Sequence, residues 1–174
     1  MPNWVYNNIE VEEKYTEKLK QIADKGICQY LMPEPQAYGD TTSPTPSKED
    51  NPYVYELSQL LLKHHGFENW WDWRKKHWGV KWDASKHWQH GDYIPYLKDR
   101  YYRFDTPWSP PNISIFELLA KEIPNFSYWW EEEQGFGQEW ECVNGELRLI
   151  SEWDLPDWKD NSDSKKPFES CGTL

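Results

Sequence analysis

The sequence lacks the features by which a secreted or membrane-bound protein is recognised. It has only three cysteines, an odd number without the paired spacing of metal ligands, so we expect reduced thiols in a cytoplasmic protein. No apolar run approaches the length of a membrane span, and the first residues do not resemble a signal peptide. We therefore expect a protein without a membrane partner.

Motifs that would predict catalysis are also missing. There is no Walker-type sequence and no Gly-x-Gly-x-x-Gly, and Gly135-Phe-Gly137 is too short to be a phosphate loop. Glu131–Glu133 could supply an acid and a base, but an acidic run is more often a solvated strand end. His87 and His90, with Asp92 nearby, lack the second His or Cys cluster that a metal site needs. We expect no enzyme, no cofactor and no metal site.

Acidic and aromatic residues are abundant instead. The 30 Asp and Glu outnumber the 19 Lys and Arg, which gives a formal net charge of −11. A protein that wraps nucleic-acid backbone needs a basic surface, so we expect no direct contact with nucleic acid. Trp, Tyr and Phe make up 17% of the 174 residues while aliphatic residues are sparse, so the core must be largely aromatic.

The first part of the chain predicts a strand, a helix and a second strand. Apolar and polar residues alternate over Trp4–Val11, which is typical of a half-buried strand. A helix begins at Thr16 and ends at Gly26. The segment Ile27–Met32 is short, largely apolar and followed by Pro33, so we expect a second strand there.

A long insertion follows this unit. Residues 36–52 are rich in Pro, Ser and Thr and indicate a loop. Asn51 then caps a helix that Gly66 closes. The tryptophan-rich motif, residues 69–83, comes next, and residues 84–97 are polar and resemble an irregular excursion.

The chain after the insertion repeats the order strand, helix, strand. The strands are expected at Tyr101–Thr106 and Phe126–Glu133, with a helix from Ser114 between them. Two such units predict an α+β protein with a ferredoxin-like antiparallel sheet and helices on one of its faces. We expect one domain over residues 1–155, with an insertion at residues 36–100. An acidic, polar tail is expected over residues 156–174.

A terminal hairpin is predicted at Asn144-Gly145. This dipeptide favours a type I′ turn, because both central residues of that turn have positive φ. The turn sets a register with three expected pairs: Cys142 with Leu147, Glu141 with Arg148, and Trp140 with Leu149.

The tryptophan-rich motif is the densest feature of the sequence, with five of the thirteen tryptophans. Asn69 is placed to cap a short helix and Gly79 to end it. One interpretation is a buried aromatic core with basic side chains along it. The other is a ligand-binding wall of aromatic faces edged by cations, formed by Trp70, Trp71, Trp73, Arg74, Trp78, Lys81, Trp82, Arg103 and Trp108.

Four short segments occur in a fixed order: Met1–Trp4, Gly66–Trp73, Trp78–Ala84 and Thr106–Pro111. Together they resemble the Api-like proteins of phages and conjugative plasmids, a family with a ferredoxin-like domain and no assigned function. The resemblance covers roughly residues 1–140; it departs from the family pattern at Trp71, where the family has tyrosine, and in the tail. It implies a mobile-element origin and a ferredoxin-like fold, and it carries no catalytic residue.

Three hypotheses for function follow, all without catalysis. The first is an accessory protein in the host cytoplasm, active against host defence, that binds a small nucleotide-like ligand at the tryptophan-rich wall. The second is an acidic surface that imitates nucleic acid and blocks a host defence protein, through Glu131, Glu132, Glu133, Glu139 and Glu141. The third is a structural or assembly role without a ligand. Cations clustered in the aromatic motif favour the first hypothesis. The sequence does not predict the oligomeric state.

Overall fold

The computed structural model describes residues 3–84 and 96–154, and a six-stranded antiparallel sheet forms its centre. The strands lie in the order β2-β3-β1-β4-β5-β6, so the first strand of the chain has neighbours on both sides. Their bounds are β1 Trp4–Val11, β2 Tyr96–Lys98, β3 Tyr101–Pro107, β4 Phe126–Glu132, β5 Phe136–Val143 and β6 Glu146–Asp154.

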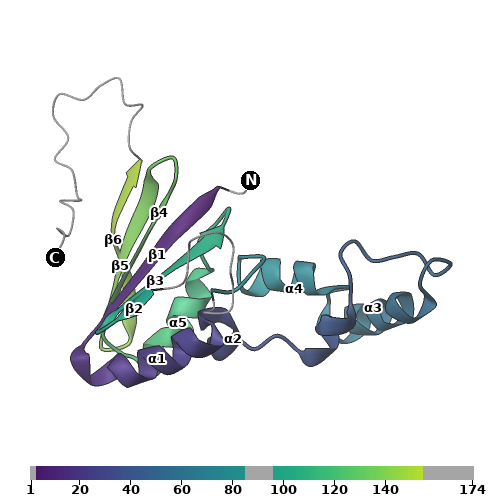
Figure 1. Ribbon diagram of the computed structural model, residues 1–174, viewed down its shortest axis with the longest axis horizontal. Helices are drawn as coiled ribbons and strands as arrows, with labels where there is room; N and C mark the ends of the chain where they lie inside the picture. Colours follow the sequence, from purple (N-terminus) through teal and green to yellow (C-terminus); the bar gives the residue numbers. More distant parts are fainter. Residues whose placement is uncertain (1–2, 85–95, 155–174) are drawn as a thin grey trace.

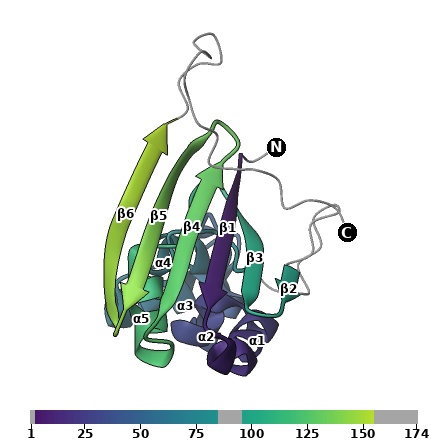
Figure 2. The same ribbon diagram turned by 90° about the vertical axis from the view of Figure 1, so that its left-hand side faces the viewer.

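The helices lie on one side of this sheet. Figure 1 shows α1 and α5 along the sheet, while α4 and α3 extend away from it as an arm. Figure 2 shows the sheet from the side that carries no helices in the described part of the chain, with the helices behind it. Their bounds are η1 Glu13–Tyr15, α1 Thr16–Lys25, α2 Ile27–Leu31, η2 Gln36–Asp40, α3 Pro52–His65, α4 Trp70–His77 and α5 Ile113–Glu122.

The predicted ferredoxin-like fold is confirmed. The order β1-α1-β2-β3-α5-β4 is two strand–helix–strand units, and their four strands lie side by side as β2-β3-β1-β4. Strands β1 and β4 pair directly, with Val5 opposite Glu132 and Val11 opposite Phe126. β5 and β6 then extend the sheet beyond β4.

The second strand of the first unit is not where the sequence predicted it. Residues 27–31 of the predicted strand Ile27–Met32 form helix α2, and the unit is completed instead by β2, which follows the insertion. The carboxylate of Asp83 accepts the backbone N–H groups of Cys28 (3.0 Å) and Gln29 (2.6 Å), which are otherwise unpaired at a helix start. A contact from 55 residues away therefore stabilises a helix where the local pattern favoured a strand.

The predicted hairpin has the predicted register. Cys142 is opposite Leu147, and the Glu141–Arg148 and Trp140–Leu149 pairs follow. Asn144 (φ 52°) and Gly145 (φ 83°) both have the positive φ of a type I′ turn. Beyond Trp140 the register shifts by one residue, so Glu139 is opposite Ser151 and Ile150 is left without a partner.

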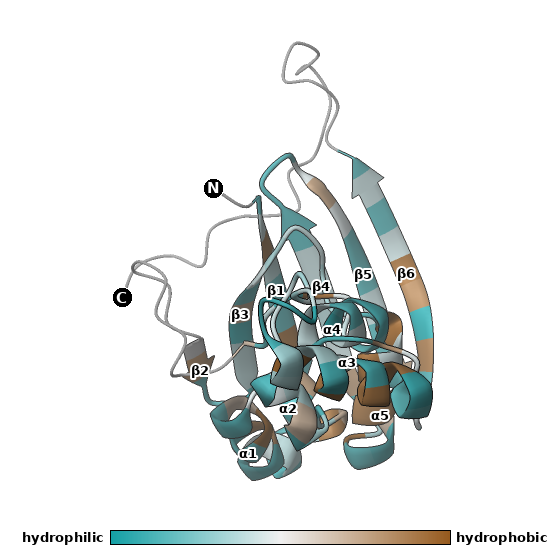
Figure 3. Cartoon of the chain, turned by 90° about the vertical axis from the view of Figure 1, so that its right-hand side faces the viewer, coloured by the Kyte–Doolittle hydropathy of each residue, from teal (hydrophilic) through white to brown (hydrophobic). Residues whose placement is uncertain are grey.

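The core lies between the sheet and α1, α2 and α5, and aromatic side chains fill much of it. Phe116 of α5 stacks on Tyr128 of β4, with ring centroids 3.6 Å apart and planes 20° apart. Tyr102 and Phe104 of β3 also stack, at 4.9 Å. Figure 3 shows the side of the molecule that carries the helices and colours part of α5 as apolar. The buried residues of α5 are Ile115, Phe116, Leu119 and Ala120.

One polar side chain, that of Asn7, lies within this apolar side of β1 and is 1% exposed. Its amide donates to the Val5 carbonyl (3.0 Å) and to Thr106 Oγ1 (2.9 Å), and Tyr128 Oη donates to its oxygen (2.9 Å). The group is thus fully hydrogen-bonded, which burial of an amide requires. In residues 3–84 and 96–154, none of the helices combines the length and the apolar character that crossing a membrane requires.

Candidate functional site

The tryptophan-rich motif folds as predicted around α4. Asn69 caps the helix by accepting the N–H groups of Trp71 (3.0 Å) and Asp72 (3.1 Å). Trp73 and Trp78 are only 6% and 2% exposed and belong to the core. Trp78 Nε1 donates to the Met32 carbonyl at 2.8 Å, so these two indoles hold α4 against the main domain.

Arg74 occupies the centre of this contact. Its Nε and one terminal nitrogen donate to the two carboxylate oxygens of Glu34, at 2.9 and 2.6 Å, and the other terminal nitrogen donates to the Lys81 carbonyl at 3.3 Å. The guanidinium carbon lies 5.0 Å from the ring centroids of both Trp70 and Trp78. The charge of Arg74 is therefore balanced inside the protein.

A second aromatic group lies at the end of the motif. Lys81 Nζ is 4.5 Å from the ring of Trp82, whose own ring lies 6.0 Å from that of Trp108 with planes 32° apart. Trp108 is 53% exposed and has φ 64°, a strained value for a bulky residue. Its backbone N–H donates to the Asn3 carbonyl at 2.8 Å.

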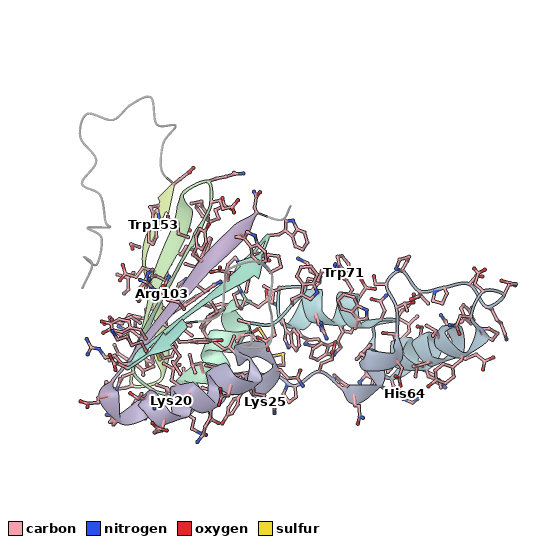
Figure 4. The ribbon with its side chains drawn as sticks, viewed as in Figure 1. Lys20, Lys25, His64, Trp71, Arg103 and Trp153 are labelled. Atoms are coloured by element: carbon pink, nitrogen blue, oxygen red, sulfur yellow. The ribbon has the colours of Figure 1, made fainter. Side chains whose placement is uncertain are left out.

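The nine predicted wall residues do not form one surface. Trp71 is 38% exposed on α4, whereas Arg103 is on β3, at the far side of the sheet; Figure 4 labels both and shows their separation. The structure thus brings Trp70, Trp73, Arg74 and Trp78 together in one packed cluster and places Lys81, Trp82 and Trp108 beside it.

A pocket of about 470 Å³ lies next to this cluster. Its lining comes from the end of α1 at Lys25, from Gln29 of α2, from residues 34–39, from α4 and from Trp82 and Asp83. Lys25 and Gln29 are not among the residues predicted from the sequence, because they lie far from the tryptophan-rich motif along the chain.

Asp83 is the buried acid of this region. Burial raises the pKa of its carboxyl group to about 6, although the N–H groups of Gln29 and Cys28 oppose that shift. The same carboxylate explains why residue 26 is a glycine. Gly26 has φ 97°, and a Cβ at this position would lie 2.5 Å from Asp83 Oδ2. Burial also raises the pKa of the Cys28 thiol, which makes it unreactive.

The other face of the sheet forms a second candidate surface, which we call the open face. In the described part of the chain no helix lies over it (Figure 2). Directly paired residues form three rows across it. The rows are Arg148-Glu141-Ser127-Glu10-Tyr101-Lys98, Ser151-Glu139-Trp129-Asn8-Arg103 and Trp153-Gly137-Glu131-Tyr6-Asp105.

Rings and carboxylates alternate in the third row, apart from Gly137. In the second row Trp129 is next to Glu139, and Arg103 ends the row. The indole of Trp153 lies over Gly137, and a Cβ at Gly137 would be 2.5 Å from the Trp153 ring. Trp153 Nε1 donates to Glu131 Oε2 at 3.2 Å. Ser151 Oγ donates to Glu139 Oε2 at 3.2 Å. Burial raises the pKa of Asp105 to about 6.

The five carboxylates of the acidic hypothesis divide between two places. Glu131, Glu139 and Glu141 are on the open face, where Glu10 and Asp105 join them. Glu132 pairs with Val5 and so alternates onto the helix side of β4, and Glu133 follows the strand. Glu10 and Asp105 were missed because β1 and β3 are distant in sequence from β4 and β5.

No metal site is expected from the sequence, and His87 and His90 lie outside the described part of the chain. Residues 3–84 and 96–154 contain no group of three or more His, Cys, Asp or Glu that could hold a metal ion. The predicted tail, residues 156–174, also lies outside the described residues.

Comparison with known proteins gives one distant structural similarity. A scan against models of protein families finds no match, and a search of curated proteins finds no significant match. A solved structure of a protein api92 from Yersinia pseudotuberculosis, of the family DUF1281, is similar at 11% identity and a TM-score of 0.49. The match covers 91% of this chain and 100% of that one. A similarity at this level does not assign this chain to a family.

Proposed function

We propose that the chain is a non-enzymatic accessory protein that binds a basic host protein through the open face. The observation that carries this proposal is that an aromatic ring is next to a carboxylate in each of the two rows through Trp129 and Tyr6. Trp129 is paired with Glu139 on one side and Asn8 on the other, and Tyr6 lies between Glu131 and Asp105.

This arrangement suits a cation that is both flat and a multiple hydrogen-bond donor. A guanidinium group can lie on an aromatic ring while its N–H groups donate to a neighbouring carboxylate. Carboxylates accept such charge-assisted bonds in pairs, which adds direction to the attraction. Arginine side chains of a partner protein therefore match the open face better than a neutral or acidic surface would.

A nucleic acid is the main competing ligand for an aromatic sheet face. Bases stack on exposed rings, and single-stranded RNA is bound in this way by other open sheets. On this face the rings lie beside Glu131, Glu139 and Asp105, which would repel phosphates. Five carboxylates in the three rows outnumber the three cations Lys98, Arg103 and Arg148. The net charge of −11 acts in the same direction.

The biological setting of the proposal comes from the resemblance to mobile-element proteins. A host protein that binds nucleic acid has arginines placed to meet phosphates, and carboxylates on this chain would stand in for those phosphates. We therefore propose that the partner is a nucleic-acid-binding protein of host defence.

The test uses a fluorescent octa-arginine peptide as a defined basic probe. The variant Glu131→Gln, Glu139→Gln, Glu141→Gln removes three charges from the open face. The matched control Glu13→Gln, Glu49→Gln, Glu117→Gln removes three exposed charges from elsewhere in the chain. Fluorescence anisotropy gives the dissociation constant of each protein, and circular dichroism confirms that each is folded.

We expect the open-face variant to bind the peptide at least tenfold more weakly than the parent, and the control less than about twofold more weakly. Equal losses in the two variants would mean that only the net charge matters, and would overturn the assignment to this face. A parent that binds a single-stranded oligonucleotide more tightly than the peptide would contradict the choice of partner.

A further inference from the structure

We infer that the pocket between α2, residues 34–39 and α4 is a binding site for a mononucleotide-like ligand, a flat ring that carries an anionic group. The pocket lies on the helix side of the sheet, away from the open face, so this inference is independent of the proposed function. Its volume of about 470 Å³ is within the usual range for small-molecule sites.

Both carboxylates in the pocket wall already accept hydrogen bonds from the protein. Glu34 is held by two N–H groups of Arg74 in a pair whose side chains are 10% and 24% exposed. The carboxylate of Asp83 is turned toward the backbone N–H groups of Cys28 and Gln29. Neither acid is therefore placed to repel an anion as strongly as a free carboxylate would.

Two ammonium groups at or beside the pocket are not paired with a carboxylate in the described residues. Lys25 is exposed at the pocket edge, its Nζ lies 5.8 Å from the ring of Tyr30, and within the described residues it makes no ion pair. Lys81 stands beside the pocket with its Nζ over Trp82. In a chain of net charge −11, two such ammonium groups mark a local preference for an anion.

The remaining wall residues suit a heterocyclic ring. Trp82 lines the pocket, and the contact of its ring with Trp108 limits the orientations it can take. The side-chain oxygen of Gln29 accepts the Glu34 N–H at 3.1 Å, which leaves the amide NH₂ to donate to the edge of a ring. An indole in the wall, an amide for the ring edge and a cation for the anionic group together fit a mononucleotide.

The test is isothermal titration calorimetry with AMP, GMP, CMP and UMP. Inorganic phosphate and adenosine are the two partial probes, one without the ring and one without the charge. Lys25→Gln removes the cation and keeps most of the side chain. Gly39→Tyr adds a bulky side chain at a residue that lines the pocket, and it should do so without a clash, because a Cβ at Gly39 meets no atom within 4 Å. Lys63→Gln, at an exposed position of α3, is the control.

We expect at least one mononucleotide to bind at least tenfold more tightly than phosphate or adenosine. Lys25→Gln and Gly39→Tyr should each weaken it at least tenfold at an unchanged melting temperature, while Lys63→Gln binds like the parent. No heat from any of the four mononucleotides would overturn the inference, as would an affinity that Lys25→Gln and Gly39→Tyr leave intact.

Discussion

The Arg74 guanidinium contacts Glu34, the Lys81 carbonyl and the rings of Trp70 and Trp78 at once. These contacts join α4 to the segment after α2, so the side chain stabilises the arm. Arg74→Gln removes the charge and leaves Glu34 in a largely buried position without its partner. We expect a loss of about 2–3 kcal/mol in the free energy of unfolding, measured by urea denaturation.

Lys81→Gln is the matched control for Arg74. Its ammonium group lies over the rings of Trp82 and Trp70 and makes no ion pair in the described part of the chain. We expect its unfolding free energy to stay within about 0.5 kcal/mol of the parent. If Arg74→Gln were as stable as Lys81→Gln, the ion pair with Glu34 would contribute nothing to the fold.

Asp83 and Asp105 make stability depend on pH. Burial raises the pKa of each to about 6 from the ordinary value of 3.8, so the folded chain binds these two protons more tightly than the unfolded chain. Their contribution to stability therefore falls as the pH rises from about 4 to about 6, and increases again on acidification. We expect the melting temperature to rise between about pH 7 and about pH 5.

Asp105→Asn isolates one of these two groups. This variant should show a smaller rise in melting temperature on acidification than the parent, because it no longer titrates at that position. Asp40→Asn, at an exposed position, should keep the rise of the parent. Identical pH profiles for Asp105→Asn and the parent would contradict the raised pKa of Asp105.

At the scale of elements, the β5–β6 hairpin depends on its turn. Asn144 has φ 52°, and its backbone N–H donates to Asn125 Oδ1 at 2.8 Å. Asn144→Pro fixes φ near −65° and removes that N–H, so we expect a loss of about 2 kcal/mol or more, measured as a lower melting temperature. Asn144→Gly accepts positive φ and should stay close to the parent. A proline variant with the parent melting temperature would refute this account of the turn.

The sequence predicted elements well where local patterns determined them. Alternation over β1, the cap at Asn69 and the Asn-Gly turn each depend on residues that are close in sequence, and the structure has all three. The strand predicted at Ile27–Met32 was wrong, because residues 27–31 form helix α2. The first turn of that helix is stabilised by Asp83, and no local sequence pattern reveals this contact. Strand β2 was missed because it has only three residues.

At the scale of the whole molecule, the surfaces were harder to predict than the fold. The density of tryptophan and cations suggested one wall, but packing places Trp73 and Trp78 in the core and Arg103 across the sheet. The open face gathers residues from all six strands, β1 to β6, into rows. Such rows exist only once strand order and register are known, so a single sequence could not reveal them.

The position of β1 in the sheet has a consequence for how the chain folds during synthesis. Ile9 is opposite Tyr102 in one neighbour and Tyr128 in the other, so both neighbours of β1 are made long after it. At translation rates of about 5–20 residues per second, the apolar side of β1 waits for several seconds before it can be covered. Contacts of such long sequence separation also slow folding. In the nascent chain, β1 is therefore accessible to chaperones before it can pair with β3 and β4.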